Sequence, residues 1–436
     1  MNNVLLVSHN SLSNHANNVK TLHSIFFEWE KESLAQLYFQ DEVPESLRFK
    51  KFFRIRDVDI IKRVFRLNSE CGGVVESREF VPNHRGDSSG FVFAIIQKLK
   101  KYDTLRRIFR EFIYGTLLWR TKKLNVWINE FKPNAVFLVG SNYSFAFVIG
   151  RKIAIELNIP LFVYFTDDYI LNNSSRNIFE RALNSRLKRK LTQCVAEAKD
   201  VFVIGSDMAK SYEVYFGRKF FHIMNSIDFD QKPTAKKYKN KEHINIVYAG
   251  GLTLGRGDVI CEFSQIAIKA ALISSITVSI TVYSVESPTL QLMKMFDLNH
   301  VIFRGRLSGD ELKSVLNSAD FLLHVESSCN EFKSKTKLSV STKIPEYLSM
   351  GICLIAYGPS DISSINLIRN NAIGIVIVDS DSFESQVENL RKYFSNPDLC
   401  ERVASVGCQF AFENFNSMNV RALIKKKICS ANDMVS

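Results

Sequence analysis

The chain has 436 residues, of which 46% are hydrophobic and 23% charged, and 57 lysines and arginines against 45 acidic residues give a formal net charge of +12. This composition is typical of globular proteins and excludes a long disordered chain, and eight cysteines are too sparse for a disulfide scaffold. At this length we expect two domains, each large enough to bury its own core.

The beginning of the chain, MNNVLLVSHN, lacks the basic residues and the long apolar run of a secretory signal peptide. The longest uncharged run, 133–150, contains Asn and Ser side chains, so we expect no membrane span. No two cysteines form a CxxC pair, and the histidines show no metal-ligand spacing. We therefore expect a cytoplasmic protein with reduced thiols and no metal site.

Short β-rich runs alternate with helical stretches through the first half of the chain. Strands are predicted at 3–8, 34–39, 135–139, 161–165, 201–204 and 220–224. Helices are predicted at 19–31, 145–157, 179–198 and 207–216. The polar stretch 70–90 is expected to be irregular. This alternation predicts a parallel sheet built from βαβ units.

The pattern stops at the polar, lysine-rich segment 226–243, which has the composition of a linker, and then restarts. Strands are predicted at 244–249, 276–283, 301–303, 321–325, 353–356 and 374–378. Helices are predicted at 258–273, 310–317, 344–349, 362–370, 382–394 and 398–415. We therefore expect two consecutive doubly wound α/β domains, whose ligands bind beyond the carboxyl ends of the strands.

The segment NIVYAGGLTLGRGD, residues 245–258, ends a strand in Gly250 and Gly251 and leads into a helix. Glycines let backbone N–H groups approach an anion, and the forked guanidinium of Arg256 suits phosphate oxygens. The spacing matches neither the dinucleotide-binding fingerprint nor the P-loop. The alternative interpretation is a glycine turn in an ordinary βα unit.

The segment SVSTKIPEYLSMGICLIAYG, residues 339–358, predicts a second anion site. Ser341 and Thr342 are good caps for a short helix, and Lys343 adds a positive charge at its start. Glu346 lies one turn further on a similar face and could accept two hydroxyl hydrogen bonds, as ribose binding requires. The alternative is a capped helix with a surface Lys–Glu pair.

Together these segments make the carboxyl-terminal half resemble the donor-binding domain of retaining GT-B glycosyltransferases of group 1, the GT4-like family. The resemblance covers about residues 244–415, and STKIPEYLSMG is similar to the family's "sK..EylasGkPvia" segment. It implies an α/β GT-B fold, with two Rossmann-like domains facing each other across a cleft. These would be an acceptor-side domain over 1–230, a donor-binding domain over 244–415 and a helical tail over 416–436 that crosses back to the first domain.

The resemblance also implies roles for individual residues. The positions that match the family's donor site are Gly250, Gly251, Arg256, Arg304, Ser341, Thr342, Lys343 and Glu346. Arg304 would lie in the base-binding loop, Glu346 would bind the nucleotide ribose, and the others would surround the diphosphate. Many members carry two glutamates separated by seven residues, but here Leu338 stands eight positions before Glu346, so the first is missing. Glu326 and Glu331 precede it out of register.

The first domain offers fewer signals. His9 directly follows the first strand, and Asn18 stands where the family often has glycine, so both are candidates for the acceptor side. Asp167 and Asp168 end a predicted core strand, where an open α/β sheet places active groups, and either could orient an acceptor hydroxyl. The alternatives are a solvated loop histidine and a pair of helix-capping aspartates.

The segment 98–123 carries nine basic residues against two acidic ones, interleaved with apolar residues. A basic amphipathic helix is typical of proteins that bind an anionic membrane surface. The alternative is an amphipathic helix that covers the sheet. The charge also permits nucleic-acid binding, but no known nucleic-acid-binding signature is present, so we expect no such partner.

The leading hypothesis is a glycosyltransferase that moves a sugar from a nucleotide-diphosphate donor to a glycan or lipid-linked acceptor in cell-envelope polysaccharide synthesis. It would act in the cytoplasm, at the inner face of the plasma membrane, with retention at the anomeric carbon and without a cofactor. Arg256 and Lys343 would stabilise the departing diphosphate, a task that a metal performs elsewhere. The alternatives are a non-catalytic subunit of the same fold that binds nucleotide or glycan, and a nucleotide-sugar epimerase.

Overall fold

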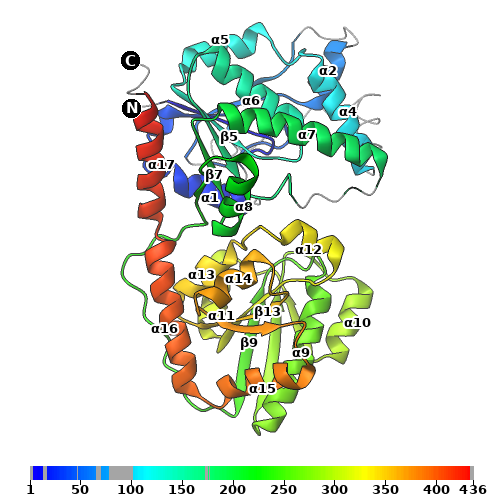
Figure 1. Ribbon diagram of the computed structural model, residues 1–436, viewed down its shortest axis with the longest axis vertical. Coiled ribbons are helices and arrows are strands. Elements are labelled where there is room, and N and C mark those ends of the chain that lie inside the picture. Colours follow the sequence, from blue (N-terminus) through cyan, green and yellow to red (C-terminus); the bar gives the residue numbers. More distant parts are fainter. Residues whose placement is uncertain are drawn as a thin grey trace. The chain divides into compact units, whose positions relative to one another are not determined.

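The computed structural model describes residues 3–12, 17–46, 48–64, 70–77, 102–171, 175 and 177–432, with the backbone alone for residues 17–20 and 432. The chain divides into two compact units (Figure 1). Unit 1 comprises Met1–Ile223 and Val420–Ser436, and unit 2 comprises Met224–Asn419. Each unit contains one parallel-rich sheet covered by helices.

In the described part of unit 1 the sheet has eight strands in the order β4-β3-β2-β1-β5-β6-β7-β8. Their bounds are β1 Val4–Ser8, β2 Leu34–Tyr38, β3 Lys51–Arg54, β4 Gly73–Val75, β5 Ala135–Val139, β6 Leu161–Phe165, β7 Asp200–Val203 and β8 Phe221–His222. The pairing of β3 with β4 is antiparallel, whereas the other pairs are parallel. Strands β1, β2, β5 and β6 are buried along their whole length, as expected when helices cover both faces of a parallel sheet.

The helices of unit 1 follow the strands in βαβ order. They are α1 Asn17–Ile25, α2 Asp57–Val64, α4 Asp103–Gly115, α5 Lys122–Phe131, α6 Ser144–Glu156, α7 Ile178–Glu197 and α8 Ser206–Phe216, with α17 Ser417–Asn432 joining from the end of the chain. Successive residues of β1 face opposite sides: Val4 and Leu6 pack in a core with Ile424 and Ile428 of α17. Arg421 Nε donates to Ser24 O at 3.0 Å, and Lys427 pairs with Asp200 at 3.3 Å, so α17 is held in unit 1 by polar contacts as well.

The sequence-based prediction missed one corner of this sheet. The stretch 70–90 was expected to be irregular, but Gly73–Val75 forms β4 and pairs with β3, while residues 78–90 lie outside the described part. Strand β3, with the sequence KFFR, was not predicted because only its two middle residues, Phe52 and Phe53, are fully buried. Four residues are too few to show a periodic pattern.

The basic segment 98–123 is not one helix. Residues 98–101 lie outside the described part, α4 ends at Gly115, and Leu117 adopts a positive φ of 62° that no helix continues through. Thr121 then caps α5 by accepting from Leu124 N at 3.1 Å. The prediction failed because apolar periodicity continues across a turn that only the backbone reveals.

Unit 2 contains an all-parallel sheet in the order β11-β10-β9-β12-β13-β14. The strands are β9 His243–Ala249, β10 Thr277–Tyr283, β11 Val301–Gly305, β12 Phe321–Val325, β13 Cys353–Gly358 and β14 Ile375–Val378. The helices are α9 Arg256–Ile273, α10 Leu290–Leu298, α11 Gly309–Ser318, α12 Asn330–Thr336, α13 Lys343–Ser349, α14 Ser363–Asn370, α15 Phe383–Phe394 and α16 Pro397–Asn414. Predicted and observed strands agree closely here, and α10 and α12 are the helices that the pattern missed.

The lysine-rich segment 226–243 is packed against unit 2 and is not a free linker. Lys236 N donates to Gly351 O at 2.7 Å, and the Tyr238 hydroxyl accepts from Cys353 N at 2.6 Å, at the start of β13. A Cβ at Gly351, whose φ is 65°, would lie 2.1 Å from Thr234 O, so this close approach requires glycine. Composition suggested a linker because many of the segment's contacts are hydrogen bonds and ion pairs, such as those of Lys237 with Glu401 and of Lys241 with Asp320, which leave no hydrophobic pattern.

Among the described residues no helix combines the length and apolar character needed to cross a bilayer. Nor do three or more metal-type side chains gather there into a potential metal site.

Candidate functional site

The first candidate site is the loop between β9 and α9 in unit 2. Strand β9 ends at Ala249, and the chain turns through Leu254 and Gly255, with φ values of 59° and 73°, before α9 begins at Arg256. A Cβ at Gly255 would meet the Phe332 ring at 2.8 Å, so glycine allows both the left-handed backbone and the close packing. The turn brings Arg256 back toward the carboxyl ends of the strands.

Helix α13 places Lys343 against the same loop. The Tyr347 hydroxyl, one turn after Lys343, accepts from Ala249 N at 3.0 Å and donates to Ala249 O at 2.9 Å, which ties the helix to the end of β9. Lys343 Nζ lies 5.3 Å from the centre of the Tyr248 ring. A Cβ at Gly250 would lie 1.8 Å from this ammonium nitrogen. The structure therefore brings Gly250 and Lys343 together, and a side chain at Gly250 would displace the ammonium group.

A buried carboxylate holds Arg256. Glu326, which directly follows β12 and is 3% exposed, lies with Oε2 at 3.3 Å from Arg256 Nη2 and Oε1 at 3.3 Å from His324 Nε2. Burial raises the pKa of Glu326, but His324 and Arg256 outweigh it and hold the pKa below its usual value. Burial is the largest single influence on Arg256 and lowers its pKa, but the Glu326 charge and hydrogen bond together with Tyr248 and Glu286 raise the pKa above its usual value. This pair stays ionised.

Lys343 is in a different electrostatic state. Burial and the neighbouring Arg256 charge lower the pKa of Lys343 to about 8, although Glu326 and Glu346 act in the opposite direction. Among the described side chains none forms an ion pair with this ammonium group. At neutral pH Lys343 is therefore mostly charged and poorly solvated, with no described carboxylate within ion-pair distance, so an anion that reached it would relieve this cost.

Two of the loop amides already bind a carboxylate. Glu286, in the loop after β10, accepts through Oε2 from Leu252 N at 2.6 Å and from Thr253 N at 3.0 Å. These amides are therefore occupied by an internal carboxylate, and binding of an external anion by the glycine loop stays a prediction. We refer to Tyr248, Gly250, Arg256, Glu286, Glu326 and Lys343 as the glycine-loop cluster.

The remaining expected donor residues make fewer or weaker contacts with the glycine loop. Thr342 precedes α13 but makes no side-chain cap, and Ser341 Oγ accepts from Lys343 N at 3.5 Å, so the expected capping is weak. Glu346 is half-buried on α13, and Gly251 lies against the Glu286 carboxylate. Arg304 is exposed on the edge strand β11. Of the eight expected donor residues, Gly250, Arg256 and Lys343 form the centre of the site.

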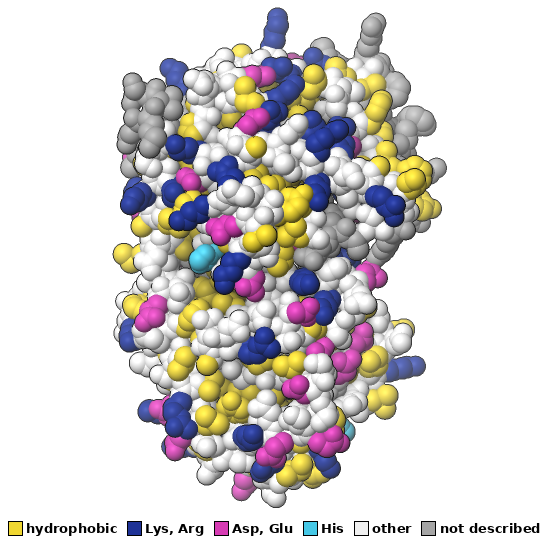
Figure 2. Space-filling view, viewed as in Figure 1, with side chains coloured by type: hydrophobic (Ala, Val, Ile, Leu, Met, Phe, Trp, Pro, Cys, Tyr) yellow, Lys and Arg dark blue, Asp and Glu magenta, His cyan; other side chains and the backbone are white. Residues whose placement is uncertain are grey.

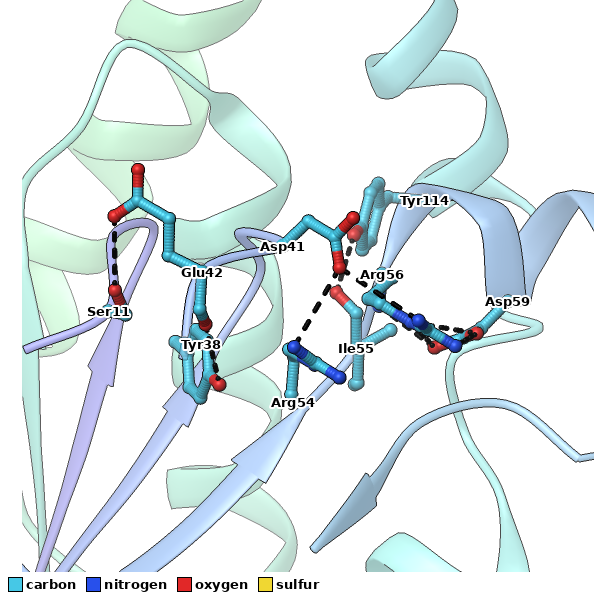
Figure 3. Close-up of polar contacts among 9 residues, drawn as sticks. All are labelled: Ser11, Tyr38, Asp41, Glu42, Arg54, Ile55, Arg56, Asp59 and Tyr114. Atoms are coloured by element: carbon cyan, nitrogen blue, oxygen red, sulfur yellow. Dashed lines mark hydrogen bonds and ion pairs between the residues drawn. The ribbon is translucent and has the colours of Figure 1, made fainter. Parts of the chain in front are cut away.

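The second candidate site is a cavity of about 780 Å³ in unit 1, at the carboxyl ends of β1, β2, β5 and β6. We refer to it as the strand-end pocket. Its polar lining includes Ser8, His9, Ser11, Asp41, Glu42, Arg56, Asp57, Arg106, Arg107, Arg110, Asn142 and Asp167. Figure 3 shows the side of the pocket formed after β2 and β3, where Asp41, Glu42 and Arg56 lie. This is the position at which an open α/β sheet binds ligands.

His9 is part of the pocket wall and is not the solvated loop histidine of the alternative interpretation. Its ring stacks on Tyr143 with centroids 4.4 Å apart, Nδ1 lies 2.6 Å from Asn10 Oδ1, and Nε2 contacts the Arg110 guanidinium. Arg110 also donates to Asp57 Oδ1 at 3.0 Å and to Phe39 O at 2.7 Å. Burial and the Arg110 charge lower the pKa of His9 to about 3. His9 is therefore neutral at physiological pH and accepts through Nε2.

The two aspartates after β6 separate into different roles. Asp167 is exposed and lines the pocket. Asp168 Oδ1 accepts from Ile170 N and Leu171 N, each at 2.9 Å, and from the Tyr212 hydroxyl at 2.8 Å. Asp168 thus stabilises the turn after β6 and caps no helix that the structure describes, because α7 begins only at Ile178 with Asn177 as its cap. Asn18 lies in the first turn of α1, where only the backbone is described.

Several residues of these sites were absent from the expected set. Glu326 and Asp41 each follow closely on a predicted strand, so the strand-end rule that selected Asp167 would also have selected them. Arg110 was identified only as one charge of a basic segment. Tyr347 lies within the STKIPEYLSMG run, but no role was expected of it, and Glu286 carries no sequence signal that separates it from ordinary surface residues.

Comparison of the sequence with protein-family models and with curated protein sequences gives no match. Solved structures with the same fold exist. HepE from Anabaena, in complex with UDP-glucose, is 11% identical, with a TM-score of 0.57 over 98% of this chain and 99% of that one. WaaG, a glycosyltransferase involved in lipopolysaccharide biosynthesis, is 12% identical, with a TM-score of 0.55 over 99% of both chains.

The α,α-trehalose 6-phosphate synthase from Burkholderia multivorans is 8% identical, with a TM-score of 0.60 over the full length of both chains. At such identities the likeness shows the fold and nothing finer. The chain thus has the α/β GT-B architecture with two Rossmann-like domains, as its sequence predicted. The expected cleft between them stays a prediction.

Proposed function

We propose that this chain transfers a sugar from a nucleotide-diphosphate donor to a glycan or lipid-linked acceptor, with retention at the anomeric carbon. The observation that supports the proposal most directly is the desolvated ammonium group of Lys343, which lies against Gly250 and near Arg256 and has no ion-pair partner among the residues that the structure describes. A diphosphate would supply the missing negative charge. That HepE was crystallised with UDP-glucose is consistent with this choice of donor class.

In this mechanism unit 2 binds the donor and acts on its leaving group. As the bond from the anomeric carbon to the diphosphate breaks, negative charge grows on the phosphate oxygens. Lys343 and Arg256 would then stabilise the transition state more than the ground state, because they are already fixed in place by Tyr347 and Glu326. Glu346 would bind the ribose, and no step requires a cofactor.

Unit 1 would hold the acceptor in the strand-end pocket, with Asp167 at the carboxyl end of β6 orienting its hydroxyl. His9 would shape the wall without exchanging a proton, because it stays neutral and is bound at both ring nitrogens. Retention and a role in cell-envelope polysaccharide synthesis rest on the sequence resemblance.

The proposed cytoplasmic location at a membrane surface depends on which side chains of α4 are free to contact lipid. Arg106 and Arg110 of α4 pair with Asp103 and Asp57, and Figure 2 shows basic side chains interspersed with acidic ones over the visible face. The exposed side of α4 carries Leu105 and Phe112, which are 52% and 69% exposed. A membrane contact through α4 would therefore rely on apolar insertion as well as on charge. Binding to vesicles that persists at about 0.5 M salt would support it, and complete release would favour charge alone.

The direct test is a thermal-shift panel of nucleoside diphosphates, followed by a transfer assay with the nucleotide sugar of the best binder. Stabilisation by UDP or GDP supports the donor site, since a ligand that binds only the folded state raises its stability. Binding without turnover over a panel of glycan and lipid-linked acceptors would indicate the alternative of a non-catalytic subunit. Conversion of the donor sugar to its epimer would indicate an epimerase, and absence of nucleotide binding would contradict the proposal.

A further inference from the structure

The strand-end pocket holds cations that are already neutralised. Arg110 Nε lies 3.0 Å from Asp57, Arg106 Nη2 lies 2.7 Å from Asp103, and Arg56 donates to Asp59 at 2.8 Å. Each of these three guanidinium groups therefore forms an ion pair with a carboxylate of the protein. Although the chain as a whole has a net charge of +12, these three cations offer little attraction to an incoming anion.

The charges that remain in the pocket are of both signs. Arg107 Nη2 donates to two neutral oxygens, Asn142 O at 3.2 Å and Asn184 Oδ1 at 3.1 Å, so its charge is not cancelled locally. Glu42 receives a hydrogen bond from the Ser11 hydroxyl at 3.4 Å. Figure 3 shows Asp41 turned toward Arg54 and Arg56, whereas Glu42 is turned away from both guanidinium groups. A negatively charged ligand would thus meet the Glu42 carboxylate.

These groups suit a ligand with many hydroxyls. Carboxylate and amide oxygens accept hydrogen bonds from hydroxyls, and guanidinium groups donate to them, so one sugar can use both kinds of partner at once. Apolar surface comes from Phe39, Phe109 and the Tyr143 ring that stacks on His9. The pocket volume of about 780 Å³ lies within the range of sites that enclose a small organic ligand.

We propose that the strand-end pocket binds an uncharged, hydroxyl-rich sugar unit of the acceptor and discriminates against phosphorylated or carboxylated units. This inference rests on the proposed glycosyltransfer. It narrows the acceptor from any glycan or lipid-linked molecule to one whose receiving residue is a neutral sugar. The reaction would then extend an existing chain, and an earlier sugar transfer must have placed a neutral residue on the carrier.

The test is a titration of the full-length protein in which binding is monitored by saturation-transfer NMR. The probes are methyl hexopyranosides, the corresponding methyl hexopyranoside 6-phosphates and the corresponding methyl hexuronosides. We expect at least one neutral probe to bind, and its phosphate and its uronate to bind at least tenfold more weakly, because both place a negative charge near the Glu42 carboxylate. Equal or tighter binding of the charged probes overturns the proposal, and so does absence of binding by every neutral probe.

A substitution tests whether Glu42 carries the discrimination. Glu42→Gln keeps the size and one hydrogen-bond acceptor but removes the charge, so we expect the ratio of neutral to phosphorylated affinity to fall at least threefold. Glu130→Gln, at an exposed site on α5, removes the same charge from unit 1 and should leave the ratio unchanged. An unchanged ratio in Glu42→Gln, with an unchanged unfolding temperature, assigns the selectivity elsewhere and contradicts the role given to Glu42.

Failure of this proposal can be distinguished from failure of the proposed function. Nucleoside-diphosphate binding is measured separately by thermal shift and depends on unit 2. If the nucleotide binds while the charged sugars are preferred, the donor site stands and the acceptor class is wrong.

Discussion

Each unit contains a buried cation at the carboxyl ends of its strands, and the two cations are in opposite states. In unit 1 Arg110 is bound by Asp57, Phe39 O and His9. Burial lowers its pKa, but Asp57, Tyr114 and Tyr143 together raise the pKa above the usual value. In unit 2 Lys343 has no ion-pair partner among the described residues, and burial lowers its pKa to about 8. Burial disfavours the charged form of both side chains, so the absence of an ion-pair partner among the described residues is what distinguishes Lys343 and supports the ligand-binding role proposed for it.

The comparison predicts that the two cations respond differently to removal. Arg110→Met should cost about 3 kcal/mol of unfolding free energy, because it leaves the partly buried Asp57 carboxylate without its partner. Urea denaturation of the full chain measures this loss. Arg107→Met, on the same helix, leaves no carboxylate unpaired and should cost less than about 1 kcal/mol. Equal losses of unfolding free energy in the two variants would contradict the structural role assigned to Arg110.

Lys343→Met should have the opposite effect to Arg110→Met: ligand affinity should fall while stability does not. It removes an uncompensated buried charge, so we expect stability to be unchanged or increased. Affinity for a nucleoside diphosphate and the rate of transfer should each fall about 100-fold, which corresponds to about 2.7 kcal/mol. Isothermal titration with UDP and GDP measures the first quantity. Retained affinity in a folded variant would show that the diphosphate binds elsewhere.

Gly250→Ala also tests whether the diphosphate binds at Lys343, but without changing a charge. The added methyl group would occupy the position of the Lys343 ammonium and approach the Tyr248 hydroxyl, so the lysine must move. We expect nucleoside-diphosphate affinity to fall about tenfold, or 1.4 kcal/mol, with little change in unfolding temperature. Gly309→Ala, in the same unit and with open space around it, is the matched control. A similar loss in both variants would point to a general effect of alanine on unit 2.

The pH dependence gives a smaller effect with a defined sign. Above pH 8 the free protein loses the Lys343 proton, so nucleoside-diphosphate affinity should fall by about fivefold between pH 8 and 9. Unfolding free energy should move the other way. Between pH 8 and the ordinary lysine pKa of about 10.4, the unfolded chain binds more protons at this group, so its contribution to stability rises with pH. Both trends are measured as differences from Lys343→Met, which cancels other titrating groups.

Much of the fold could be predicted from the sequence because its signals are local. Strands β5, β6 and β12 were placed at their observed bounds, since each is a continuous apolar run between turns. The glycine pair after β9 and the STKIPEYLSMG run indicated the two segments that meet at Lys343. In contrast, β3 and β4 were missed because strands of four and three residues are too short to show a periodic pattern.

In the candidate sites, too, some features follow from local sequence and others only from the tertiary structure. The chain's residues alone determined an α/β fold of two doubly wound domains and selected Gly250, Arg256, Lys343 and Asp167, because glycine turns, helix starts and strand ends are properties of short segments. Only the tertiary structure decided which charges are cancelled. Glu326 binds Arg256, Glu286 binds the loop amides, and Asp57 binds Arg110, each across more than thirty residues of chain. Electrostatic neutralisation depends on distance in space, and that distance is set by how the strands and helices pack.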